Sequence, residues 1–215
     1  MKIKYLGHSC FYLESETGVS ILTDPFTKVG YELQSGIQAD VVLTSHGHFD
    51  HNFVQAVSTD CVISEAGKTD CFGIKIEGID SFHDPLQGRL RGKNVIFKFI
   101  VDGITICHLG DLGEPCNAEL LAKIGKIDVL LLPVGGTYTI DAAHAYEYAQ
   151  NIAPKMVIPM HFKPLDGALD ISSADEFLGF YDEKQIQRVV NGEVALSLND
   201  LTEETLILYM ERVKV

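Results

Sequence analysis

The sequence predicts an α+β fold, a four-layer αββα sandwich in which two packed β-sheets lie between outer helices. Three observations favour this class. Apolar runs of strand length alternate with helical segments, several consecutive strands are close enough to form hairpins, and no Pro/Ser-rich linker divides the chain. The length of 215 residues fits one domain, so we expect residues 1–215 to form a single unit. Functional side chains in such folds gather on loops at one end of the strands.

Each element follows from its apolar pattern and from the turn residues beside it. The expected strands are residues 2–6, 9–15, 18–24, 40–45, 61–64, 73–79, 94–101, 104–109, 128–134 and 156–160, with two final strands near 186–198 and 205–213. The expected helices are residues 52–57, 118–124, 142–152 and 172–181. The pair Asp102-Gly103 is a strong hairpin signal, and the run 40–45 is apolar enough for a strand buried on both faces.

The two halves of the chain share one pattern. A strand ends at Asp24, and Asp40 opens an apolar strand 16 residues later. Another strand ends at Asp111, and Asp128 opens the next one 17 residues later. This repetition indicates two similar β-rich halves that face each other, although buried strands also resemble one another by coincidence.

The composition argues against several functions. The chain has 17 Lys or Arg against 30 Asp or Glu, a formal net charge of −13, which disfavours a nucleic-acid partner and an anionic membrane surface. No apolar stretch has membrane-spanning length, and the first residues have the pattern of a strand, not of a signal peptide. The five cysteines are odd in number and lack CxxC spacing. We therefore expect a cytoplasmic protein without disulfides. The sequence is compatible with a monomer or an oligomer.

The segment His46-Gly47-His48-Phe49-Asp50-His51 is the strongest functional signal. His46 and His48 are two residues apart just after a buried strand, so both imidazoles can reach one metal ion. Asp50 and His51 follow the turn, at the head of the expected helix 52–57, and can serve a second ion. Without a ligand, this many crowded imidazoles and carboxylates would be costly to bury.

Two metal ions need more ligands than this segment supplies. Three other residues follow expected strands in the same way and are candidates, namely His83, Asp111 and His161. Each alone could instead be an ordinary core or turn residue.

The chain resembles the metallo-β-lactamase superfamily of metal-dependent hydrolases in its HGHFDH segment, its later His, its Gly-Asp and its Pro-Met-His-Phe. The resemblance runs from Lys2 to about His161. The opening GHSCFYLE, TDPF, HLGDLG and IPMHF are most similar to the small metal-dependent hydrolase branch, which is related to ascorbate-6-phosphate lactonase and to the phospholipase D that cleaves N-acyl-phosphatidylethanolamine. The fold implied is the αββα sandwich expected above.

The resemblance also implies a ligand set and a reaction. His46, His48 and His83 would hold one ion, and Asp50, His51 and His161 the other. Asp111 would bridge the two, and a hydroxide between the ions would be the nucleophile. Asp50 would also act catalytically by orienting that hydroxide and moving a proton. Two divalent ions are expected, Zn first, with Mn, Fe or Ni as alternatives for this His and carboxylate set.

The expected activity is the hydrolysis of a phosphodiester or of a lactone or other ester in a small anionic substrate. The alternative is a metal-binding or ligand-sensing protein with little turnover. The ligand set argues against that alternative, because closed structural zinc sites favour Cys.

Four further residues are candidates for supporting a ligand or contacting substrate. Asp24, before Pro25, would accept a hydrogen bond from a metal-binding His of the HGHFDH segment, or it would only form a turn. His8 would hydrogen-bond substrate or a ligand, or it would be a surface turn residue. Arg89 and Arg91 follow His83 and would bind a phosphate or carboxylate, or they would belong to a solvated hairpin loop.

Overall fold

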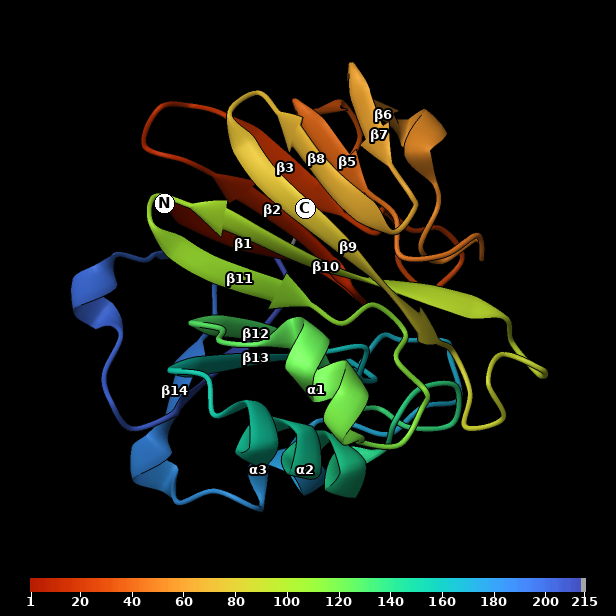
Figure 1. The fold of residues 1–215 in the computed structure, drawn as a ribbon, viewed down its shortest axis with the longest axis vertical. Helices are drawn as coiled ribbons and strands as arrows, with labels where there is room; N and C mark the ends of the chain where they lie inside the picture. Colours follow the sequence, from red (N-terminus) through yellow and green to blue (C-terminus); the bar gives the residue numbers. More distant parts are fainter. Residues whose placement is uncertain (214–215) are drawn as a thin grey trace.

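Two packed β-sheets form the centre of the computed structural model, which describes residues 1–213, and the α-helices lie against the outer face of one sheet (Figure 1). The N-terminal sheet has the order β15 (Glu193–Ala195), β1 (Lys2–Gly7), β2 (Cys10–Glu14), β3 (Ser20–Thr23), β5 (Val41–Leu43) and β7 (Cys61–Ile63). The C-terminal sheet has the order β14 (Ile186–Val189), β16 (Leu206–Met210), β13 (Met156–Met160), β12 (Val129–Pro133), β11 (Ile104–His108), β10 (Lys93–Val101), β9 (Ile74–Phe82) and β8 (Gly67–Cys71).

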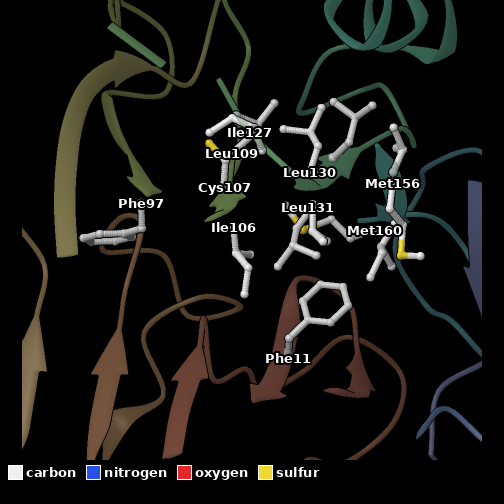
Figure 2. Close-up of a cluster of buried hydrophobic side chains, with 14 of the residues drawn as sticks. Phe11, Phe97, Ile106, Cys107, Leu109, Ile127, Leu130, Leu131, Met156 and Met160 are labelled. Atoms are coloured by element: carbon white, nitrogen blue, oxygen red, sulfur yellow. The ribbon is translucent and has the colours of Figure 1, made fainter. Parts of the chain in front are cut away.

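The main apolar core fills the space between the two sheets. Figure 2 shows Phe11 of β2 pointing toward Ile106 and Leu131 of the opposite sheet, and all three side chains are fully buried. In β5, Val41 and Leu43 belong to this core, whereas Val42 between them belongs to a second apolar cluster. The strand alternation therefore buries both faces of β5, as its continuous apolar run predicts.

The helices α1 (Ala118–Ile124), α2 (Ala142–Ile152) and α3 (Asp175–Leu178) cover the C-terminal sheet (Figure 1). The side chain of Asn117 accepts the Leu120 N–H at the start of α1, and that of Asp141 accepts the His144 N–H at the start of α2. The bounds of α1 and α2 agree with the prediction. The expected helix 172–181 is shorter, and only Asp175–Leu178 is α-helical.

The outer face of the N-terminal sheet has a different cover. The second apolar cluster there includes Leu22 and Val42 of the sheet and Phe26 and Val29 of the following loop. The expected helix 52–57 is only a 3-10 turn, η1 (Val54–Ala56). Beside it, β4 (Ile37–Gln38) and β6 (Val57–Ser58) form a small parallel pair. The sandwich is confirmed. The layer outside the N-terminal sheet, however, consists of loops, a 3-10 turn and a short strand pair, where the sequence predicted a helix.

The C-terminal segment also departs from prediction. The expected strand 186–198 is two strands in different sheets, because β14 pairs with β16 and β15 pairs with β1. The turn η2 (Glu183–Gln185) precedes β14, and η3 (Leu198–Asp200) follows β15. The prediction missed β8, an edge strand whose sequence GKTDC lacks an apolar pattern.

Six strands end at the edge of the sandwich that carries the site. In the N-terminal sheet, β1, β3 and β5 run in one direction, since β1 and β3 each pair antiparallel with β2, and β3 pairs parallel with β5. In the C-terminal sheet, β9, β11 and β13 likewise share one direction. No helix among residues 1–213 is long and apolar enough to span a membrane.

Candidate metal centre

Loops at the carboxyl ends of these six strands place all the predicted ligands together. β1 leads to His8, β3 to Asp24 and β5 to the segment 46–51. β9 leads to His83, β11 to Asp111 and β13 to His161. Both sheets therefore contribute, and the site lies where their edges meet. The backbone joins the sheets there, because the Val95 N–H donates to the Ser45 carbonyl at 2.8 Å.

His46, His48 and His83 form the first cluster. His46 Nε2 lies 2.9 Å from His48 Nδ1, and the ring centroids of His46 and His83 are 4.6 Å apart. The three residues offer ligand atoms within 4.8 Å of one another. His48 is the exposed member, and His83 is buried.

The second cluster consists of Asp50, His51, His161 and His8. His51 Nε2 is 3.8 Å from Asp50 Oδ2 and 3.1 Å from His8 Nε2. The four residues again present ligand atoms within 4.8 Å of one another. Asp50 and His51 lie in a turn that precedes η1, so the prediction that they start a helix is wrong. His8 is buried, and the surface-turn alternative is therefore wrong as well.

Asp111 lies between the two clusters. Its Oδ2 is 3.3 Å from His83 Nε2 on one side and 3.3 Å from His161 Nε2 on the other, and its Oδ1 is 3.1 Å from His51 Nε2. The Asp111 N–H donates to the side-chain oxygen of buried Asn94 at 2.9 Å. Asp111 therefore contacts ring nitrogens of both clusters.

Asp24 holds His51 in place. Its Oδ2 is 2.8 Å from His51 Nδ1, which leaves His51 Nε2 facing the cluster. The Ser45 N–H and hydroxyl also donate to the Asp24 carboxylate, each at 2.7 Å. Asp24 is fully buried and has a left-handed backbone (φ 39°), a conformation that non-glycine residues seldom adopt.

The charges and burial of the site shift its pKa values in opposite directions. Burial, followed by the charge of His51, lowers the pKa of His46 to about 3, so this imidazole is neutral. Burial alone would lower the pKa of His51, but the carboxylates of Asp111 and Asp24 outweigh it and raise that pKa well above its usual value. Burial would raise the pKa of Asp111, and the neighbouring His161 and His51 instead hold it well below the usual range.

The donor set fits divalent metal ions. Asp111 Oδ1 and His161 Nε2 are buried, and among the described residues their short contacts with neighbouring charged groups lack the geometry of a hydrogen bond. Buried polar atoms normally have a partner, so these atoms point to a ligand at the centre of the site. Imidazole and carboxylate are the ligands that Zn, Mn, Fe and Ni use in proteins.

Loop 84–92 stands beside this centre and follows His83. The Asp84 carboxylate accepts four backbone N–H groups at 2.8–3.1 Å, those of Leu86, Gly88, Leu90 and Arg91. Arg91 donates to the Thr137 carbonyl at 3.0 Å and lines a cavity of about 320 Å³ with Tyr138 and His144. Arg89 is exposed and does not line that cavity.

Sequence reasoning missed three supporting residues: Ser45, Asp84 and Asn94. An Asp before Pro85 was an available signal for the loop, since such residues cap nearby backbone N–H groups. The Asn94 amide group bonds Ser81 Oγ and the Leu109 carbonyl, and a polar residue beside an apolar strand was a weak sign of it.

Known proteins match both this chain and its fold. A family model described as a beta-lactamase superfamily domain matches residues 2–161. The chain belongs to the metallo-β-lactamase superfamily. The UPF0173 metal-dependent hydrolase of Carboxydothermus hydrogenoformans is 31% identical over 192 residues, which cover 75% of this chain and 84% of that protein. The superfamily assignment confirms the predicted fold and the predicted class, a metal-dependent hydrolase.

Two further proteins match more of the chain. The UPF0173 metal-dependent hydrolase of Nanoarchaeum equitans is 29% identical over 218 residues, covering 88% of this chain and 96% of that protein. A crystal structure from Thermotoga maritima, described as a Zn-dependent hydrolase of the metallo-β-lactamase superfamily, is 37% identical with a TM-score of 0.79. That match covers 98% of this chain and 99% of the other.

Proposed function

We propose that this superfamily member is a dinuclear metal-dependent hydrolase that cleaves a phosphodiester, or a lactone or other carboxylic ester, in a small anionic substrate. The position of Asp111 carries the proposal. One carboxylate oxygen lies 3.3 Å from a ring nitrogen of each cluster, so a single side chain can serve two ions. Superfamily membership alone does not fix the reaction, since the loops differ between members.

The ligands divide as the two clusters do. His46, His48 and His83 would hold the first ion, and Asp50, His51 and His161 would hold the second. Two divalent ions would lower the pKa of a water molecule toward neutrality and polarise the bond that it attacks. Zn suits the three-histidine cluster, and Mn, Fe or Ni are alternatives.

Asp50 is the residue that we assign to proton transfer. Its side chain is 15% exposed, against 2% for Asp111, so it is the carboxylate of the cluster that an attacking water can reach. Burial would raise its pKa, but the neighbouring imidazoles of His8 and His51 keep that pKa below its usual value. Asp50 is therefore ionised at neutral pH and can accept the proton of the attacking water.

Arg91 supports an anionic substrate. It lies in the loop that follows His83, and its guanidinium is 5.7 Å from the centre of the Tyr138 ring. The four backbone bonds to Asp84 fix the loop that carries it. The cavity that Arg91 lines contains none of the proposed metal ligands, but it includes Asp84 and Gly113, which lie close in sequence to His83 and Asp111. A guanidinium there can bind a phosphate or carboxylate group in bidentate fashion. The exposed Arg89 would add only a longer-range charge.

We also propose a cytoplasmic location. Cys10, Cys61, Cys71, Cys107 and Cys116 are all free, as expected for a reducing compartment.

Turnover by metal-loaded protein tests the proposed reaction. Chelator-treated protein would be reloaded with Zn²⁺ or Mn²⁺ and assayed with bis-p-nitrophenyl phosphate and with a panel of lactones. We expect hydrolysis in one of these substrate classes, a loss of at least about 100-fold in His48→Ala, and retained activity in the distant Asp40→Asn control. No hydrolysis with any metal, together with unfolding of His48→Ala, would support a metal-binding protein instead.

Arg91→Ala tests the anionic substrate separately. We expect a higher KM for an anionic substrate and an unchanged KM for a neutral ester, because only the anion loses a charge-assisted contact. Equal effects on both substrates would contradict a role for Arg91 in anion binding.

A further inference from the structure

His8 is held at the second cluster by an unusual backbone. It follows Gly7 in the turn between β1 and β2, and both residues have positive φ angles, 114° for Gly7 and 54° for His8. The left-handed conformation is one that non-glycine residues seldom adopt. The His8 carbonyl accepts the Tyr5 hydroxyl at 2.9 Å and the His161 N–H at 2.8 Å. The fold thus ties this turn of the N-terminal sheet to the end of β13.

The His8 ring points into the cluster of ligands. The residue is 1% exposed, and its Nε2 lies 3.1 Å from His51 Nε2 and 3.3 Å from Asp50 Oδ2. Its ring centroid is 4.3 Å from that of His161. Ligand atoms on adjacent positions of one ion, each at about 2.1 Å from the metal, lie about 3 Å apart. The spacings of His8 Nε2 match that arrangement.

We propose that His8 is a direct ligand of the second metal ion, beside Asp50, His51 and His161. The inference rests on the proposed function and deepens it. With Asp111, the second ion has five protein ligands, whereas the first has His46, His48 and His83 with Asp111.

The two ions are then inequivalent. The first ion would have four protein ligands and the second five. Each would still have room for a water molecule, because Zn²⁺ accepts a fifth ligand and Mn²⁺, Fe²⁺ and Ni²⁺ accept six.

The competing role for His8 is a hydrogen bond that only positions Asp50. His8→Ala removes the imidazole, and Tyr5→Phe is the matched control, since it removes the hydroxyl contact to the same turn and keeps the imidazole. Both variants and the wild type would be titrated with Zn²⁺ and Mn²⁺ by calorimetry, with Mn²⁺ binding also followed by electron paramagnetic resonance.

We expect two ions per chain in the wild type and in Tyr5→Phe. In His8→Ala, the affinity for one ion stays at the wild-type value, which also shows that the variant is folded, and the affinity for the other falls at least about 100-fold. A fall of less than about 100-fold at both positions would overturn the ligand assignment, because the loss of a residue that only positions Asp50 lowers metal affinity about 10- to 100-fold. If the wild type itself binds no ion, the proposed function fails as well.

Discussion

Gly110 leaves no room for a side chain beside the candidate bridging carboxylate. Its φ angle is 56°, and a Cβ there would overlap the Asn94 amide oxygen and lie 2.5 Å from the Ser45 Cβ. Both neighbours contact residues of the site: the Asn94 side-chain oxygen accepts the Asp111 N–H, and the Ser45 N–H donates to the Asp24 carboxylate. The glycine is therefore required by the packing of the candidate metal centre as well as by the turn.

Gly110→Ala should destabilise the protein by about 3–5 kcal/mol, because the strained backbone and the overlap add together. Gly73 is the control. It lies in the tight turn between β8 and β9 with a φ of 79°, and a Cβ there meets nothing within 4 Å, so Gly73→Ala should cost only about 1 kcal/mol. Urea unfolding of both variants measures the difference, and equal losses would show that the contact with Asn94 is unimportant.

Asp24→Ala should weaken metal binding while the chain stays folded. Without the carboxylate, His51 loses the partner that fixes its tautomer and direction, which typically lowers metal affinity about 10- to 100-fold. Metal analysis after gel filtration, with circular dichroism for folding, checks this expectation. Asp40→Asn is the control with an aspartate outside the site, and an unchanged metal content in Asp24→Ala would contradict the role of Asp24.

At the level of elements, two pairs of parallel strands repeat one arrangement. Asp40 precedes β5 and accepts the Ser20 N–H at the start of β3, and Asp128 precedes β12 and accepts the Thr105 N–H in β11. β3 pairs parallel with β5, and β11 pairs parallel with β12. The equivalent contacts support the two-halves interpretation of the sequence, and each aspartate joins two neighbouring strands.

The contribution of Asp40 should depend on pH. Hydrogen bonds from the Ser20 N–H and hydroxyl, at 2.7 and 2.8 Å, lower the pKa of this carboxyl. A pKa that is lower in the folded state adds stability above the usual carboxyl pKa, and this stability disappears as the pH falls through the folded value.

Asp40→Ala should therefore cost about 1 kcal/mol at pH 7, a value kept small because the side chain is partly exposed. The difference in free energy of unfolding between the variant and the wild type should become smaller as the pH falls below about 4. Urea unfolding from pH 7 to pH 3 measures it, and a gap that widens on acidification would contradict the hydrogen bonding assigned to Asp40.

For the whole molecule, the candidate metal centre takes residues from two sheets that otherwise meet through an apolar core. The second cluster takes His51 from the loop after β5 and His161 from the loop after β13, and the two loops belong to different sheets. An ion bound to both would resist separation of the sheets. Metal binding should therefore stabilise the fold and not only support the reaction.

Metal removal should lower the melting temperature. Free ion at about 1,000 times its Kd stabilises a folded protein by about 4 kcal/mol. For a chain of this size, that corresponds to about 10 °C. Calorimetric scans with and without a chelator measure the shift, and identical melting temperatures would show that no ion joins the two sheets.

Most of the site was predictable because its residues come in a dense local motif. His46, His48, Asp50 and His51 stand within six residues, and the other predicted ligands each follow a strand that the apolar pattern predicts. The contact of Asn94 with Asp111 was not predictable, because it depends on the pairing of strands far apart in the sequence. The same limit applies to the burial of His8, which depends on how the two sheets pack.

The fold was predictable where one pattern dominated. α1 and α2 have clear apolar spacing and capping residues, and their bounds agree with expectation. The strand β8 is polar, and residues 186–198 divide between two sheets. Both features depend on pairing between distant strands, which the local sequence pattern does not determine.

A crystal structure of metal-loaded protein with anomalous diffraction at the metal edges tests the central claim most directly. The account predicts two ions per chain on either side of Asp111, one among His46, His48 and His83 and the other among Asp50, His51 and His161. A fully loaded crystal with a single ion, or with ions that do not contact Asp111, would contradict it.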